Sequence, residues 1–498
     1  MSRPDHARWR RTSPLAALYF FGRFLRFVSR NATQSLAPLA ALLFATGGDL
    51  SGRLALVGTV ALGIALAVSI LAYLFFRYRI TDDSILVREG VFRKRQLDIK
   101  FDRIQAINTR QNVVYRWFGV VTVTFDTAGS AQEEGSLPAI PTALADSLRK
   151  KTRRGGGRPA ETSEETEANT PPPILALTNV DMVRIGLSDN RAFILLAILG
   201  PFSEQIEAAI GEYIESRGIA EGLELTLVQG MTFGVAIVAV VLATLALASI
   251  AGAFLRFHRF RLEVDDDVMR SSAGLFTRHE QSIRFAKVQT LEARQGLLLQ
   301  WFRRFRLRAK QASSVQPGKE KHFAVPLCTA AQTDGIGREI FGDEFRDIDL
   351  APTSAAFRPI HHRYLRARIL IGGVLPALFT SSMCAALGIP GGVVFLAWIP
   401  LNALGVWIAW RKFGYIAAAD GMVLRRGLIG YRVGAFLYRK VQRIGITQTI
   451  SQRRRGLATL RFYLASGTLK LPYVDHRLAT EIRDYVLYRV ESGNLAWH

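Results

Sequence analysis

The feature that most constrains this chain is a soluble block that occurs three times, each time directly after a strongly apolar stretch. When the copies are aligned on Gln105, Gln289 and Gln442, further positions coincide without a gap: Asp83/Asp267/Asp420, Gly90/Gly274/Gly427, Gln111/Gln295/Gln448 and Ala128/Ala312/Ala465. Recurrence at fixed internal spacing is typical of duplicated structural units. The 498 residues are therefore predicted to form three modules and not one large domain.

Apolar residues make up 49% of the chain and are gathered into blocks near 36–48, 54–76, 192–202, 229–255, 369–389 and 391–410. An apolar helix of about 20 residues crosses the roughly 30 Å hydrocarbon core of a bilayer. The blocks 54–76, 229–255 and 391–410 reach this length, and each follows a shorter or more polar apolar block. We interpret each pair as a transmembrane hairpin; an interfacial or half-inserted helix is the alternative for 187–215.

Basic residues flank the apolar blocks, with Arg77 and Arg79 after the first hairpin and Arg411 and Lys412 after the third. Lys and Arg concentrate on the cytoplasmic side of membrane spans. The modules and both termini are therefore predicted to be cytoplasmic, in a protein of the inner membrane. The chain has 64 Lys and Arg against 41 Asp and Glu. We interpret the excess as residues that flank the membrane spans and contact anionic lipid. Binding to nucleic acid is not predicted, because no basic-aromatic binding motif accompanies the charge.

The predicted organisation starts with a basic amphipathic N-terminal segment (1–35), a transmembrane hairpin (36–76) and a first module (77–150). A disordered linker (151–173), a second hairpin whose first span is weak (187–255) and a second module (256–350) follow. The chain ends with a third hairpin (366–410) and a third module (411–492).

Each module is predicted to contain several short antiparallel strands followed by one helix. In the first copy, 77–81 and 84–89 have an alternating pattern and carry β-branched residues, and the aligned glycines Gly90, Gly274 and Gly427 indicate turns that need a positive φ. Residues 112–118 favour a short helical turn that ends at Gly119. The fold class is therefore α+β, with small β-barrels that each carry a C-terminal helix and each follow a transmembrane helical hairpin.

The run YRITDDSILVREGVFRKRQLDIKFDRIQAINTRQNVVYRWFGVVTVTFDTAG, from Tyr78 to Gly129, resembles the bacterial membrane-flanked PH-like domain family. The triple cassette is similar to the YdbT-like members of that family. The third module departs where Arg454-Arg455 replaces Trp117-Phe118, and the second where Arg303 replaces Gly119. The resemblance implies PH-like barrels on membrane anchors, no settled catalytic activity, and a smaller single-module membrane protein of the same family as a partner.

The polar positions shared by all three copies are the candidate surface contacts. They are a basic residue and two glutamines in each module: Arg103, Gln105, Gln111, Lys287, Gln289, Gln295, Lys440, Gln442 and Gln448. Such groups can contact the phosphate oxygens of anionic lipid headgroups. The alternative, which we favour, is that each glutamine satisfies backbone groups where a strand meets a turn and that the basic residue is solvated.

No metal, cofactor or catalytic residue is predicted, because the two cysteines and eight histidines show no ligand spacing or nucleophile-base arrangement. The function predicted from sequence is a non-enzymatic polytopic membrane scaffold or adaptor whose cytoplasmic modules bind protein partners and anionic lipid. A transporter or lipid-handling membrane protein is the alternative, and a lipid-modifying enzyme ranks third.

Overall fold

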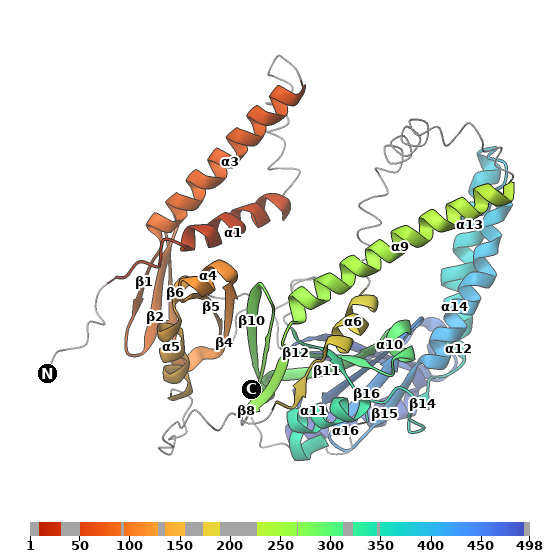
Figure 1. The fold of residues 1–498 in the computed structure, drawn as a ribbon. Coiled ribbons are helices and arrows are strands. Elements are labelled where there is room, and N and C mark those ends of the chain that lie inside the picture. The colour runs from red at the N-terminus through yellow and green to blue at the C-terminus, as the bar shows by residue number, and fades with distance from the viewer. Residues whose placement is uncertain are drawn as a thin grey trace. The chain divides into compact units, whose positions relative to one another are not determined.

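The computed structural model describes residues 9–30, 50–90, 94–127, 135–154, 173–189, 227–265, 267–311, 322–345 and 349–492 (Figure 1). These residues form two compact units, and each is described by itself. The first unit contains the first module together with Val268–Ser272 and Phe276–Arg284, and the second unit contains the rest of the chain from Pro173 onward.

The first module has two antiparallel sheets of three strands each. One sheet has the order β1-β2-β3, formed by Arg77–Ile80, Ser84–Glu89 and Arg95–Lys100, in which Val87 lies opposite both Tyr78 and Leu97. The other contains β4 (Ile104–Asn112), β5 (Val120–Thr127) and β6 (Gly135–Pro141). Helix α4 (Val113–Trp117) lies between β4 and β5, and α5 (Thr142–Arg154) closes the module.

One hydrophobic core joins these two sheets. Ile85 and Val87 of β2 are at most 1% exposed, because alternate side chains of a strand point to the same face and these two point into the core. Phe125 of β5 and Leu137 of β6 enter the same core from the other sheet. Helix α1 (Ala16–Arg30) adds Phe20, so the predicted amphipathic N-terminal segment packs onto the first module.

The second module repeats this order of elements. Its strands and helices are β8 (Arg261–Asp265), β9 (Val268–Ala273), β10 (Thr277–Arg284), β11 (Val288–Gln295), α10 (Leu297–Trp301), β12 (Phe305–Gln311), β13 (His322–Cys328) and α11 (Ala330–Phe341). In the first unit, β9 and β10 extend the second sheet of the first module, giving the order β6-β5-β4-β10-β9. Two strands of the second module thus belong to the first unit, where β10 pairs with β4 of the first module.

The third module lies within the second unit. It comprises β14 (Arg358–Pro359), β15 (Gly414–Ala417), β16 (Gly421–Arg426), β17 (Tyr431–Leu437), β18 (Val441–Thr447), α15 (Ile450–Arg453), β19 (Leu457–Leu464), β20 (Gly467–Asp475) and α16 (His476–Glu491). A seven-stranded sheet, β13-β12-β11-β17-β16-β15-β14, joins it to the second module. The sheet β18-β19-β20 completes the module, and Ala479, Ile482 and Val486 of α16 enter its core.

Four helices in the described part of the chain are long and apolar enough to cross a membrane. They are Gly58–Phe75 within α3 (Leu50–Phe75), Ala239–Phe257 within α9 (Leu227–Phe257), Arg363–Ala386, which covers α12 (Arg363–Ile369) and α13 (Leu375–Ala386), and Gly392–Lys412, which includes α14 (Trp398–Lys412). The last two pack on each other, with the Trp398 Nε1 donating to the Gly372 carbonyl oxygen at 2.9 Å. The upstream blocks 36–48 and 192–202, and linker residues 155–172, lie outside the described residues.

The predicted turn geometry is confirmed at two of the three aligned glycines. Gly90 has φ 110° and Gly274 has φ 119°. The prediction is wrong at Gly427, whose φ lies outside the left-handed range and where a Cβ would instead clash with the Gly430 carbonyl oxygen. The helical turn before β5 recurs in all three modules, and Arg303 adopts φ 52° where the first module has Gly119 at φ 60°.

Close backbone approach fixes α6 (Asn179–Leu187) against the span α9. A Cβ on Gly186 would lie 2.5 Å from the Ile250 Cα, and the Ser249 hydroxyl donates to the Gly186 carbonyl oxygen at 2.7 Å. We expect Gly186→Ala to lower the free energy of unfolding by about 1–3 kcal/mol, because the backbones must separate to admit a methyl group. Thermal unfolding of the detergent-purified protein measures the effect.

Gly335 provides the matched control, since it also lies inside a helix but a Cβ there meets nothing within 4 Å. Gly335→Ala should leave stability unchanged or raise it by about 0.5–1 kcal/mol, because alanine is the better helix former. Equal effects of the two substitutions would contradict the close-packing explanation.

Candidate functional site

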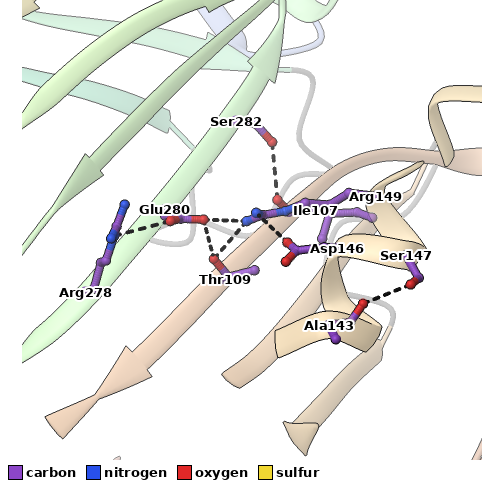
Figure 2. A network of polar contacts seen from close by, with 9 residues as sticks. All are labelled: Ile107, Thr109, Ala143, Asp146, Ser147, Arg149, Arg278, Glu280 and Ser282. Carbon is purple, nitrogen blue, oxygen red and sulfur yellow. Dashed lines mark hydrogen bonds and ion pairs between the residues drawn. The ribbon is translucent and has the colours of Figure 1, made fainter. Parts of the chain in front are cut away.

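The junction between the first and second modules carries a polar network on its paired strands (Figure 2). The Glu280 carboxylate on β10 accepts a hydrogen bond from the Thr109 hydroxyl on β4 at 2.9 Å and forms an ion pair with Arg149 of α5. Arg149 also donates to the Thr109 hydroxyl at 3.1 Å, and Arg278 approaches Glu280 at 3.3 Å. One carboxylate of the second module thus ties strand β10 to a strand and the closing helix of the first module.

The junction between the second and third modules uses the same register with different side chains. Arg278 and Tyr431 occupy the same place after the aligned glycines Gly274 and Gly427, and they face the aligned glutamines Gln111 and Gln295 respectively. Counting along the strands, the pair Glu280/Thr109 corresponds to Val433/Ala293. Val433 is 1% exposed and Ala293 2% exposed, so an apolar contact replaces the polar network.

A cavity of about 310 Å³ lies at this second junction, within the second unit. Its lining includes Thr290, Glu292 and Arg294 of β11, and the hairpin between β19 and β20 contributes Ser466 and Thr468. The Ser466 and Thr290 hydroxyls are 3.0 Å apart. The cavity is therefore built from two modules.

Positive charge dominates the cavity lining. Glu292 is the single carboxylate, and its side chain is 4% exposed. Its carboxylate oxygens lie 2.6 Å from Arg294, 3.4 Å from Arg432 and 3.8 Å from Arg426. With Lys310 and Lys470, the lining holds five cationic side chains and one carboxylate.

The pKa directions show the same imbalance of charge. Burial alone would raise the pKa of Glu292, but the charge and hydrogen bond of Arg294, with Lys310 and Arg432, hold it below its ordinary value. Burial and repulsion from Arg294 lower the pKa of the nearby Arg308 guanidinium. Glu292 is thus ionised at neutral pH and still leaves an excess of positive charge, the chemistry that attracts a phosphate-bearing or other anionic group.

The cavity also lies at the end of a candidate membrane span. Phe413, another lining residue, directly follows α14, whose last residue is Lys412. The Lys412 ammonium donates to the Leu428 carbonyl oxygen at 2.9 Å, which fixes the end of the helix to the third module. An anionic group in this cavity would therefore sit close to the point where the chain leaves the apolar helix.

The second glutamine of each repeat has a structural role in two modules. The Gln111 side-chain amide donates to the Val120 carbonyl oxygen at 3.0 Å, and Gln448 donates to the equivalent Leu457 carbonyl oxygen at 2.8 Å. Both acceptors start the strand after the helical turn. This confirms, at these two positions, the alternative that the glutamine satisfies the backbone where a strand meets a turn.

Burial removes several other candidates as exposed contacts. Gln289 is 6%, Gln295 8% and Lys440 3% exposed, because β11 and the turn before β18 lie inside the junction between modules. The Lys440 ammonium donates to the carbonyl oxygen of Ala286 in the second module. The prediction of surface contacts is therefore corrected at these three positions.

The remaining candidates differ in exposure. Gln442 is exposed on β18, and Lys287 is half-buried. The side chains of Arg103 and Gln105 lie outside the described part of the structure. The shared polar positions therefore do not form one equivalent surface on the three modules.

Two exposed tryptophans are a surface feature that the sequence reasoning missed. Trp117 of α4 is 80% exposed and Trp301 of α10 is 79% exposed, at equivalent positions of the repeat. In the second unit, Leu299 of α10 packs with Ala253 and Phe257 at the end of the span α9. Tryptophan is enriched at membrane interfaces, so the recurrence of Trp at the same place in two copies was the available signal.

The Glu280 network predicts a specific pH dependence of stability. Burial would raise the pKa of Glu280, but its hydrogen bond and ion pair with Arg149 lower it below the ordinary value of 4.5. Such a carboxylate stabilises the folded state above its unfolded-state pKa, and this contribution is lost as the pH falls through the lower folded-state pKa. We expect Glu280→Gln to reduce the free energy of unfolding by about 1 kcal/mol at pH 7.

The decrease in unfolding free energy caused by Glu280→Gln should be smaller when thermal unfolding is measured at about pH 3–4. At that pH the wild-type carboxylate is itself becoming protonated. Glu481→Gln, which changes an exposed carboxyl on α16, is the matched control and should have little effect at either pH. A loss for Glu280→Gln that is equal at both pH values would contradict this assignment.

The chain matches the Bacterial PH domain family three times, over residues 35–155, 196–340 and 369–490. It is also 22% identical over 431 residues to the UPF0699 transmembrane protein YdbT of Bacillus subtilis (strain 168), an alignment that covers 82% of this chain and 85% of that protein. The three matches coincide with the three modules and include the apolar helices that precede them. The chain is therefore a transmembrane member of the Bacterial PH domain family in which the domain occurs three times.

Proposed function

We propose that the protein is a non-enzymatic scaffold of the cell membrane, with its three PH-like modules and both termini in the cytoplasm. The observation that carries this proposal is the backbone pairing of β4 with β10 and of β11 with β17. An array of modules joined through their sheets holds several binding surfaces in a fixed order along the chain. Several weak contacts of this kind add up to strong binding, because each bound module raises the effective concentration of the next.

The partner that we propose for this scaffold is a smaller membrane protein of the same family with a single module. Such a protein would be anchored in the same membrane and would present strands of the same kind. We expect it to copurify with the tagged chain from detergent-solubilised membranes when both are expressed together. Recovery no greater than with an unrelated tagged multi-pass protein would refute this choice of partner.

The described spans give less support to a transporter. Across the four candidate spans there is no Asp or Glu, and the charged residues lie at the ends, as with Arg256 and Arg411. Transporters that couple to ions place ionisable side chains inside the membrane. The scaffold is therefore the better explanation of the described helices.

A second function is favoured by the cavity between the second and third modules. A lining of five cations and one carboxylate, next to the end of α14, fits the phosphate of a lipid headgroup or a free phosphate ion. Both ligands share the same chemistry, a compact anion that accepts several hydrogen bonds. We propose that this cavity takes an anionic phosphate group.

The orientation can be tested with an exposed position on α16. We expect Arg477→Cys, in a Cys384→Ser background, to react with a membrane-impermeant maleimide only after the cells are permeabilised. Cys328 contributes no background, because burial raises the pKa of its thiol to about 12. Labelling of Arg477→Cys in intact cells would place the third module outside and overturn the cytoplasmic orientation.

The cavity can be tested by ligand-dependent thermal stability. We expect inorganic phosphate, or nanodiscs of phosphatidylglycerol compared with phosphatidylcholine, to raise the melting temperature of the purified protein, because a ligand that binds only the folded state stabilises it. A response to the lipid alone identifies a headgroup site, and a response to both identifies a general phosphate site.

Replacing Arg426 and Arg432 together by Gln should abolish the rise in melting temperature caused by the phosphate ligand. Arg477→Gln, which changes an exposed arginine away from the cavity lining, should retain that rise. A shift that survives the double substitution would remove the cavity as the binding site.

A further inference from the structure

Two strand edges at opposite ends of the module series have no partner within the described residues. Strand β3 of the first module is hydrogen-bonded to β2 only, and β18 of the third module is hydrogen-bonded to β19 only. Open edges carry unpaired backbone N–H and C=O groups, which are templates for another strand. Among the outer strands of the described sheets, these two are the ones whose counterparts are paired at the internal junctions.

The internal junctions show which strand fits each edge. In both of them, the third strand of one module pairs with the fourth strand of the preceding module: β10 with β4, and β17 with β11. By position in the repeat, β3 is a third strand without a preceding module, and β18 is a fourth strand without a following one. Each open edge is thus of the kind that pairs with the other.

The shared register predicts how these two strands would align. Gln448 is the aligned counterpart of Gln111 and Gln295, and Lys94 occupies the same place after its aligned glycine as Arg278 and Tyr431. Pairing in this register sets Lys94 opposite Gln448, and the antiparallel direction then fixes the other pairs: Arg95/Thr447, Gln96/Ile446, Leu97/Gly445 and Asp98/Ile444. No pair sets two like charges opposite each other.

The burial of equivalent residues also indicates a missing neighbour at β18. Leu291 and Ala293 of β11 are 1% and 2% exposed because β17 covers their edge. Their counterparts Ile444 and Ile446 on β18 are only partly buried, and Gln442 is exposed where Gln289 is buried. A further third strand at this edge would bury the two isoleucines as β17 buries the residues of β11.

The charges on β3 favour this partner over a second β3. Lys94, Arg95 and Lys100 are all exposed at this edge, so pairing two β3 strands would bring cationic side chains together. Strand β18 carries a single charged residue, Arg443, which lies over the ring of Tyr463 at 5.3 Å. Like-charge repulsion thus selects between two otherwise similar edges.

We propose that copies of this chain assemble head to tail, with β3 of one copy paired to β18 of the next in the register of the internal junctions. The inference rests on the proposed scaffold function and names a second copy of the chain as a partner. The contact joins two different surfaces, so it extends into a ring or a longer row and does not close as a two-fold dimer. The modules of successive copies would then follow one another as the modules within a chain do.

Cysteine crosslinking in membranes tests this register directly. One tagged copy carries Asp98→Cys and a differently tagged copy carries Ile444→Cys, both in a Cys384→Ser background. Directly opposite residues of paired strands have Cβ atoms about 4.5–5.5 Å apart, close enough for a disulfide after modest adjustment. We expect mild oxidation to give a species containing both tags.

Leu97→Cys combined with Ile444→Cys is the matched control. Leu97 is next to Asp98 but faces the other side of the strand, so its crosslink to Ile444→Cys should be several-fold weaker. Equal crosslinking of the two pairs, or none with Asp98→Cys, would overturn the proposed pairing. Crosslinking of Asp98→Cys to a coexpressed single-module relative, without crosslinking between copies, would show that the relative and not a second copy binds this edge. The proposed scaffold function would then still stand.

A charge test at the edge checks the same contact without cysteine chemistry. Thr447 is half-buried at the end of β18 and is predicted to lie opposite Arg95. Thr447→Arg should weaken the association of copies, and Thr447→Glu should strengthen it, as measured by the yield of one tag with the other after solubilisation. If both substitutions changed the association equally, the charge at position 447 would not interact with Arg95. This result would contradict the proposed register.

Discussion

Antiparallel pairing between strands of successive modules is the interaction on which the rest of the structure depends. In an isolated module of this kind the edges of the third and fourth strands would lack partners, and strand edges with unpaired backbone groups are costly when they are buried or apolar. At the internal junctions, β10 and β17 satisfy the edges of β4 and β11. The modules are therefore coupled by backbone hydrogen bonds, and separating them would expose the polar groups of both strands.

The two junctions share a backbone register but use different side-chain chemistry. Glu280, Thr109 and Arg149 form a charged network at the first, whereas Val433 and Ala293 make an apolar contact at the equivalent place of the second. Exchanging the strands would leave Arg149 facing a valine and would bury a carboxylate against an alanine. Side chains can thus specify the order of modules even though the backbone pairing is the same.

Coupling the modules also creates a feature that no single module contains. The cationic cavity takes residues from β11 and β12 of the second module and from β16, β17 and β20 of the third. Glu292 holds three arginines near one another and remains ionised. The charge balance of this site depends on the junction, which explains why the aligned positions of the three modules do not share it.

Much of a single module could be predicted from the sequence, because its elements follow local patterns. The alternation in β2, the glycine turns at Gly90 and Gly274, the helical turn before β5 and the closing helix α16 all agree with the structure. The prediction of a positive φ at Gly427 was wrong, because a close contact with Gly430, and not the backbone conformation, requires a glycine there. Lys440 was assigned to the surface because nothing local shows that another module will cover it.

The sequence by itself determined the threefold repeat, the apolar helices and the strand content of each module, since these depend on spacing and hydrophobicity along the chain. Only the tertiary structure decided which strand edges meet, which glutamines are buried and where the cations converge around Glu292. The physical reason is that every edge strand offers the same backbone hydrogen bonds, whatever its side chains. The choice among edges is made by packing and charge between residues far apart in the sequence.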